Sequence, residues 1–131
     1  MLKKLTLLLV GIGMGFAQFT WAAGNPEKGK ALYAVCVACH GTDGAGNKAL
    51  NSPRIAGQEI WYLERQLKNF KTGVRGANSK DVYGMRMRPM AMTLPNDQAI
   101  ADVAAYVNGL KAKPPVAIIK GDTSAGKAAY M

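Results

Sequence analysis

The chain has 131 residues, of which 17 are Lys or Arg, 8 are Asp or Glu, one is His and two are Cys. This length suits one small domain, and an apolar share of 49% excludes a wholly disordered chain. Two cysteines are too few for a disulfide-rich mini-protein, one histidine excludes a site with two imidazole ligands from the same chain, and the net charge of +9 favours anionic partners.

The first 22 residues are typical of a secretory signal peptide. Lys3 and Lys4 precede an apolar run from Leu5 to Phe19, and small residues follow. The run has about 15 residues, fewer than the ~20 that cross a bilayer. We therefore expect cleavage after Ala22 and export to the periplasm, and an uncleaved membrane anchor is the alternative. Without the two lysines, 15 basic and 8 acidic residues give the mature chain a net charge of +7.

Three main helices are predicted in the rest of the chain. The first covers Pro26 to Cys36, where Asn25 can cap the helix and Pro26 suits its first turn. The second covers Glu59 to Lys71 and the third covers Asn96 to Leu110. Both carry apolar residues at spacings of three and four, which indicates a buried face. No segment shows the alternation of apolar and polar residues that is typical of a β-strand, so the predicted fold class is all-α.

Two segments between these helices are expected to be irregular. His40 to Ala56 is rich in Gly, Asn, Asp, Ser and Pro, the residues of turns and loops. Val74 to Thr93 has no clean apolar period and contains Gly76, Gly84 and Pro89. We therefore expect a basic, methionine-rich loop before the last helix.

The strongest functional signal in the chain is Cys36-Val37-Ala38-Cys39-His40. A c-type haem is attached when two thiols add across its two vinyl groups. The gap of two residues, at a helix end, sets the two sulfurs at the separation that this reaction needs. The histidine that follows is then placed under the iron as its proximal ligand.

Three other roles for this motif compete with haem attachment. A structural zinc site takes four Cys or His ligands, and the chain has three. A thioredoxin-like redox pair belongs to a βαβ setting, and none is predicted. A plain disulfide leaves the neighbouring histidine unexplained. Haem attachment also fits the export signal, because it takes place outside the cytoplasm. A covalently bound haem would in addition stabilise a small domain whose own hydrophobic core is limited.

The second axial ligand of the iron must come from elsewhere, because His40 is the sole histidine. Four methionines precede the last helix: Met85, Met87, Met90 and Met92. A thioether ligand stabilises ferrous iron and raises the reduction potential, which suits an electron carrier. At least two of the four are expected to fill the core instead, and lysine, water or an open position are alternatives.

Several stretches around the motif carry a family resemblance. They are Cys36-Val37-Ala38-Cys39-His40-Gly41, Pro53-Arg54-Ile55-Ala56-Gly57-Gln58, Tyr62-Leu63, and Leu94 with Asp102-Val103-Ala104-Ala105-Tyr106-Val107. Together they resemble class I cytochrome c, closest to the bacterial cytochrome c4 and c553 type, over Gly24 to Leu110. The resemblance implies a small domain in residues 23–110 with its helices wrapped around one covalent haem.

The same resemblance implies which residues serve the haem. In similar proteins the axial methionine lies about seven residues before the leucine that leads into the last helix. That leucine is Leu94, so the match is Met87, with Met90 as the runner-up. The Pro53 carbonyl would accept the Nδ1 proton of His40. Cys36 and Cys39 would hold the haem covalently.

The resemblance also implies a helix crossing. Gly29, Tyr33 and Tyr106 match the place where the first and last helices of the family cross. A glycine there lets two backbones come close.

The end of the chain repeats its beginning. Gly24 to Tyr33 aligns with Gly121 to Tyr130, at an offset of 97 residues, and Gly, Gly, Lys, Ala and Tyr recur in register. We expect residues 111–131 to be a proline-containing linker and the truncated start of a second, similar domain. Chance similarity of two short helix starts is the alternative.

The expected function is that of a monohaem c-type electron carrier, not an enzyme. Basic residues would steer the protein onto acidic redox partners, such as a terminal oxidase, a dehydrogenase or a cytochrome complex. Neither a small-molecule substrate nor a nucleic acid is expected, and peripheral contact with a membrane stays open. The alternatives are a haem c subunit of an oxidoreductase complex and a gas-binding or peroxidatic haem with an open iron site.

Overall fold

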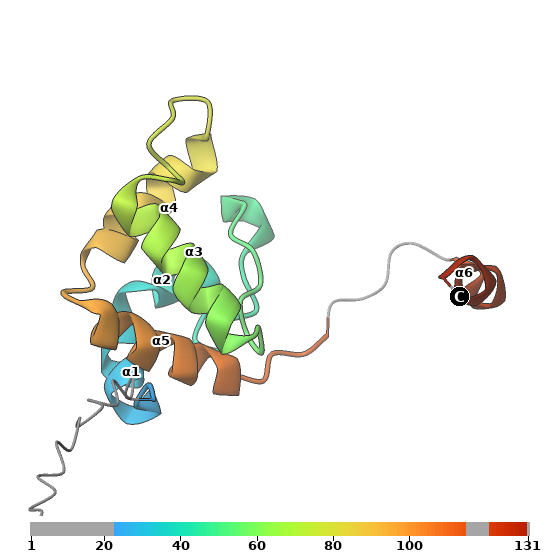
Figure 1. The fold of residues 1–131 in the computed structure, drawn as a ribbon, viewed down its shortest axis with the longest axis horizontal. Helices are drawn as coiled ribbons and strands as arrows, with labels where there is room; N and C mark the ends of the chain where they lie inside the picture. The colour runs from blue at the N-terminus through green and yellow to red at the C-terminus, as the bar shows by residue number, and fades with distance from the viewer. Residues whose placement is uncertain (1–22, 115–120, 131) are drawn as a thin grey trace, which may run out of the picture.

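The computed structural model describes residues 23–114 and 121–130, so the expected signal peptide lies outside the described residues. The main helices, shown in Figure 1, are α1 (Pro26–Leu32), α2 (Val37–His40), α3 (Ile60–Thr72), α4 (Val82–Met92), α5 (Asp97–Gly109) and α6 (Thr123–Tyr130). The described ranges contain no strand beyond one isolated bridge between Asn47 and Ser52, and none of their helices could cross a membrane. The all-α prediction is confirmed.

The first predicted helix begins as expected but ends early. The Asn25 side chain accepts hydrogen bonds from two backbone N–H groups of the first turn, at 2.9 and 3.1 Å, and Pro26 follows it. α1 ends at Leu32, and a 3₁₀ turn at Tyr33–Val35 separates it from α2. A 3₁₀ turn commonly tightens a helix end. The continuous helix expected through Cys36 is therefore wrong, and the break gives the haem motif a short helix of its own.

The second and third predicted helices are confirmed as α3 and α5, with shifts of one residue at each end. α5 is capped by Asn96, whose side chain accepts the N–H of Ala99 at 2.9 Å. The core between the helices is formed by buried apolar side chains: Tyr33, Leu63, Leu94, Ala99, Ile100, Val103, Ala104 and Val107.

The expected methionine-rich loop is wrong over Val82–Met92, which forms α4 and packs against α3. Asp81 begins this helix, because its carboxylate accepts the N–H of Gly84 at 2.9 Å. The buried face of α4 carries Gly84 and Ala91, which are seven residues apart. Helical periodicity is recognised in a sequence from large apolar side chains, and the buried face of α4 has small residues instead. Pro89, which lies inside the helix, also argued against a helix at this position.

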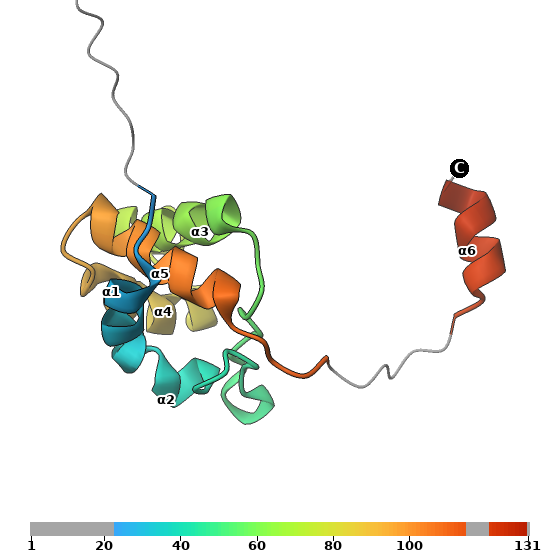
Figure 2. The ribbon, with the colours of Figure 1, turned by 90° about the horizontal axis from the view of Figure 1, so that it is seen from below.

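α1 and α5 cross at close range, as Figure 2 shows. A methyl group on Gly29 would overlap the Asp102 carbonyl oxygen and lie 2.9 Å from the Tyr106 Cβ atom. Beside this point the rings of Tyr33 and Tyr106 pack with their centroids 5.3 Å apart. The predicted crossing of the first and last helices is confirmed.

A buried carboxylate joins the start of the domain to α5. Asp102 is 4% exposed and accepts hydrogen bonds from the Asn25 N–H at 2.7 Å and the Gln98 side chain at 2.8 Å. The bond from the Asn25 backbone is the main reason why the pKa of Asp102 is lowered; the Gln98 bond adds to it and burial opposes it. The sequence analysis did not identify this contact.

The helix crossing yields a direct test. Gly29→Ala should lower the free energy of unfolding by about 1–3 kcal/mol, because the new methyl group would overlap the Asp102 backbone and press on the Tyr106 Cβ atom. Gly109→Ala is the matched control, since no atom lies within 4 Å of a Cβ atom there, and Ala suits a helix better than Gly. Urea unfolding measures both. Equal effects of the two substitutions would contradict the close approach.

The Asp102 carboxylate predicts a pH dependence. Its folded pKa lies below the unfolded value, so its stabilisation is present above pH ~4 and is lost as the pH falls through the folded pKa. Asp102→Ala should cost about 2 kcal/mol at pH 7, because the Asn25 N–H loses a charged acceptor. Urea unfolding of both proteins should show this difference shrinking below pH 4. A difference that is constant with pH would rule out the ionised carboxylate as its cause.

Candidate haem-binding site

The two cysteines and the histidine of the motif share one helical turn. Cys36 immediately precedes α2, and the N–H groups of Cys39 and His40 both donate to its carbonyl, at 3.2 and 2.9 Å. Residues three and four positions apart lie on the same side of a helix. Cys36 is half-buried and Cys39 is exposed, and both are free thiols. The turn therefore presents two thiols and one imidazole together.

The surroundings of the thiols disfavour the competing roles of the motif. Burial, with a smaller contribution from Cys39, raises the pKa of Cys36 to about 11. A catalytic or disulfide-exchanging cysteine requires the opposite shift, toward the thiolate. No group of three or more His, Cys, Asp or Glu side chains in the described part of the chain could hold a metal ion. The geometry thus gives no support to a redox pair or a zinc site.

The His40 ring is buried and its orientation is fixed. His40 is 6% exposed, and its Nδ1 atom lies 2.9 Å from the Pro53 carbonyl oxygen, the acceptor that the sequence analysis expected. A carbonyl only accepts, so the hydrogen bond places the proton on Nδ1. Nε2 makes no hydrogen bond within the described residues. In the neutral tautomer that carries its proton on Nδ1, the ring therefore offers the Nε2 lone pair to a metal.

The four candidate methionines all lie on α4, but only one is shielded. Met85, Met90 and Met92 are 47%, 37% and 53% exposed, whereas Met87 is half-buried. Met87 follows Gly84 by three residues and precedes Ala91 by four, so it shares the buried side of the helix. Met87 is thus less exposed than Met90, the runner-up.

The residues present fit a covalently attached haem. The chain offers two thiols for the vinyl groups, an imidazole with a free Nε2 atom and a half-buried thioether. Partly exposed apolar side chains, among them Val37, Ile55 and Leu67, surround the core next to the motif. A planar apolar group would cover such side chains. Cys36 and Cys39 are therefore the candidate attachment points, and His40 and Met87 are the candidate axial ligands.

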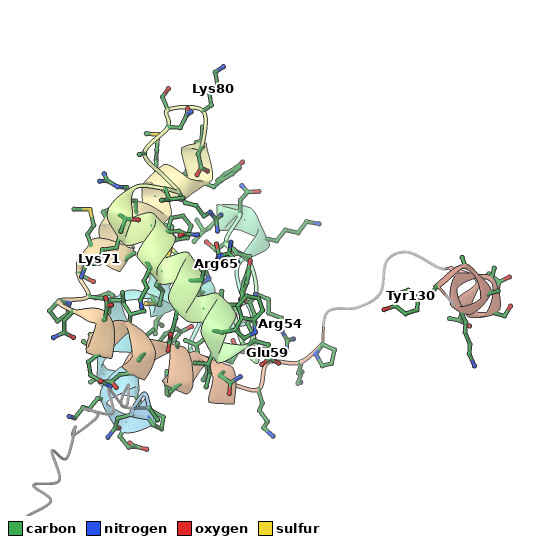
Figure 3. The ribbon with its side chains drawn as sticks, in the orientation of Figure 1. Arg54, Glu59, Arg65, Lys71, Lys80 and Tyr130 are labelled. Atoms are coloured by element: carbon green, nitrogen blue, oxygen red, sulfur yellow. The ribbon has the colours of Figure 1, made fainter. Side chains whose placement is uncertain are left out.

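Two hydrogen bonds that hold this region were missed by the sequence analysis. The buried Tyr33 hydroxyl donates to the Gly41 carbonyl at 2.8 Å, directly after the haem motif, and burial is the main reason why the pKa of Tyr33 rises to about 12. The Lys71 ammonium, labelled in Figure 3, donates to the Leu94 carbonyl, so α3 is tied to the segment that follows α4. The Tyr33 bond spans 8 positions and the Lys71 bond spans 23, and no sequence pattern marks either of them.

Comparison with known proteins agrees with this site. The family model for cytochrome c matches residues 26–111, so the chain belongs to the cytochrome c family. It is 37% identical to cytochrome c4 of Azotobacter vinelandii over 92% of this chain and 59% of that protein. It is 40% identical to cytochrome c-554(548) of Halomonas halodenitrificans over 64% of this chain and 94% of that protein.

A solved structure gives the same result. The crystal structure of reduced recombinant cytochrome c4 from Pseudomonas stutzeri matches with a TM-score of 0.55 and 41% identity, over 68% of this chain and 47% of that chain. The chain is thus a class I cytochrome c of the c4 type, and it spans about half the length of the cytochromes c4 that it matches. Membership of the family implies a covalently bound haem c.

The choice of methionine can be tested in the purified haem protein. Met87→Ala should abolish the weak sulfur-to-iron charge-transfer band of the ferric form and lower the reduction potential, because a thioether favours ferrous iron. Met90→Ala is the matched control on the same helix and should keep the band. Loss of the band in the Met90 variant alone would move the ligand to Met90. A wild-type protein without the band would indicate another ligand or an open position.

Proposed function

We propose that the chain is a periplasmic electron carrier with one haem c, held by Cys36 and Cys39 and ligated by His40 and Met87. The observation that carries this proposal is the buried His40 ring, whose Nδ1 bond to Pro53 at 2.9 Å leaves Nε2 free beside two thiols. The haem, when bound, supplies an iron that changes reversibly between ferric and ferrous. The chain itself makes or breaks no bond in a substrate.

The protein residues set the conditions for this exchange. The Pro53 carbonyl holds the proton of Nδ1, which raises the basicity of Nε2 and keeps the ring from turning. The Met87 thioether favours the ferrous state. Both donors belong to packed elements, so neither has to move when the charge of the iron changes. A fixed ligand set keeps the reorganisation energy low, as a carrier requires.

The proposed partners follow from charge. The mature chain would carry +7, since 15 basic and 8 acidic residues follow the expected signal peptide. Basic charge steers diffusion onto acidic proteins, for example a terminal oxidase, a dehydrogenase or a cytochrome complex. Export to the periplasm is supported by the sequence pattern of residues 1–22. A haem c subunit of an oxidoreductase complex is the alternative, and it would co-purify with a second polypeptide.

The proposal predicts a closed, one-electron iron site. Spectroelectrochemical titration should give a single Nernst curve for one electron, and ferrous protein should not bind carbon monoxide, since both axial positions are filled. Electron exchange with an acidic redox protein should slow as the ionic strength rises to ~0.15 M, where the Debye length is about 8 Å. Rapid binding of carbon monoxide would indicate a gas-binding or peroxidatic haem instead.

We further propose that residues 111–131 contain a linker and the first helix of a second cytochrome domain. Asp122 accepts the N–H groups of Ser124 and Ala125, at 2.9 and 3.1 Å. The Asn25 side chain accepts the N–H groups at the corresponding positions of α1. The two repeated segments are therefore similar in helix capping as well as in sequence. The side chains of residues 121–130 are exposed, as Tyr130 in Figure 3 illustrates.

This organisation defines a truncation. Ala112 is 7% exposed and Arg54 donates to the Lys113 carbonyl at 2.7 Å, so packing on the first domain continues through Lys113. Removal of residues 115–131 should therefore leave haem attachment and the midpoint potential unchanged, because α6 is too short to be stable without a partner. Pyridine haemochrome assays and redox titration measure both. A lost haem or a shifted potential would show that the tail belongs to the first domain.

A further inference from the structure

A cavity of about 350 Å³ lies where the entry segment, residues 23–25, meets α3 and α5. Its charged side chains are Glu64 and Lys68 from α3 and Asp97 from α5. The Lys68 ammonium pairs with the Asp97 carboxylate at 3.3 Å. Glu64 is half-buried and makes no hydrogen bond or ion pair with another described residue. The cavity therefore has one carboxylate in excess, and a cation would balance it.

The entry segment is held in place at this cavity by α5. Ala23 and Gly24 line the cavity. A side chain at Gly24 would overlap the Ala101 carbonyl oxygen of α5, so the contact requires glycine. One residue further on, the Asn25 N–H donates to the Asp102 carboxylate at 2.7 Å. Figure 2 shows the segment that leads into α1 lying against α5. Two successive contacts with α5 therefore fix the place of Ala23.

Signal peptide cleavage would change the charge of Ala23. The sequence predicts cleavage after Ala22. Hydrolysis of the bond between Ala22 and Ala23 consumes one water and leaves a carboxylate on Ala22 and an α-ammonium group on Ala23. An α-amino group carries this positive charge below pH ~8. In the uncleaved chain the same nitrogen belongs to a neutral peptide bond. Cleavage thus supplies, on a residue that already lines the cavity, the cation that the cavity lacks.

We propose that this cavity is the binding site for the α-ammonium group of the processed chain, with Glu64 as its counter-ion. Lys68 and Asp97 face the group as a neutral pair, and the Asp102 carboxylate adds a second negative charge two residues along the entry segment. Because Ala23 is already at the cavity, its α-ammonium group reaches Glu64 at a high effective concentration. This inference rests on the proposed export of the electron carrier, since only an exported chain loses its signal peptide.

The ion pair would give the mature chain a property that its precursor lacks. A nearby carboxylate favours the ammonium over the neutral amine, so the pKa of the Ala23 α-amino group should lie above its ordinary value. The stabilisation from the pair should be present below pH ~8 and be lost as the pH rises through the folded pKa. Removal of the signal peptide would thus fasten the entry segment of α1 to α3 as well as to α5.

The test uses the purified haem protein, with its amines methylated by ¹³C-formaldehyde and a reductant, which keeps their positive charge. NMR titration follows the α-amino signal apart from the lysines, because it titrates about two pH units lower. The wild type should bind its α-amino proton about threefold more tightly than Glu64→Gln, the strength of a partly exposed ion pair. Glu59→Gln is the matched control, since Glu59 is exposed at the start of the same helix and does not line the cavity. It should weaken proton binding by less than about 1.5-fold.

A second variant tests the position of the entry segment with Glu64 left intact. A methyl group in Gly24→Ala would overlap the Ala101 carbonyl, so Ala23 should leave the cavity and lose the same threefold advantage. Equal proton affinities in the wild type and the Glu64 variant, or equal weakening by the Glu59 variant, would overturn the inference. Intact mass should show a chain that begins at Ala23, and a retained signal peptide would overturn both the inference and the proposed export. Loss of the ferric charge-transfer band from the wild type would instead contradict the proposed iron ligation, whatever the titration shows.

Discussion

The hydrogen bond between His40 Nδ1 and the Pro53 carbonyl is the constraint on which the haem side of the domain depends. His40 ends a helix of four residues, so its own helix cannot fix the ring. The acceptor arrives from 13 residues further along the chain. The intervening loop turns back on itself, and the Gly46 N–H donates to the His40 carbonyl at 2.9 Å. A side chain at Gly46 would lie 2.6 Å from the Pro53 carbonyl carbon, so glycine is required for this return.

The methionine side is held by polar contacts at both ends of α4. Asp81 caps its start and ties it to the preceding loop through Gly76. Lys71 holds the Leu94 carbonyl just after its end. Between these two ends α4 packs against α3. The proposed ligand on α4 is thus positioned by caps and close packing, whereas the proposed ligand on α2 is positioned by one buried hydrogen bond.

The sequence predicted those structural features that depend on residues a few positions apart. The cap at Asn25, the apolar stripes of α3 and α5 and the haem motif all follow from spacings of a few positions. α4 was not predicted because its buried residues, Gly84 and Ala91, are too small to produce a visible apolar pattern. The burial of Asp102 depends on a contact across 77 positions, which no local pattern encodes.

The central claim is that both thiols of the motif hold one haem covalently and that His40 ligates its iron. The most direct measurement is haem retention after acid-acetone extraction, followed by a pyridine haemochrome assay and intact mass, in the wild type and in the Cys36→Ala and Cys39→Ala double variant. The account predicts one retained haem per chain in the wild type and none in the variant. Haem that extracts freely from the wild type, or a mass without a bound haem, would contradict it.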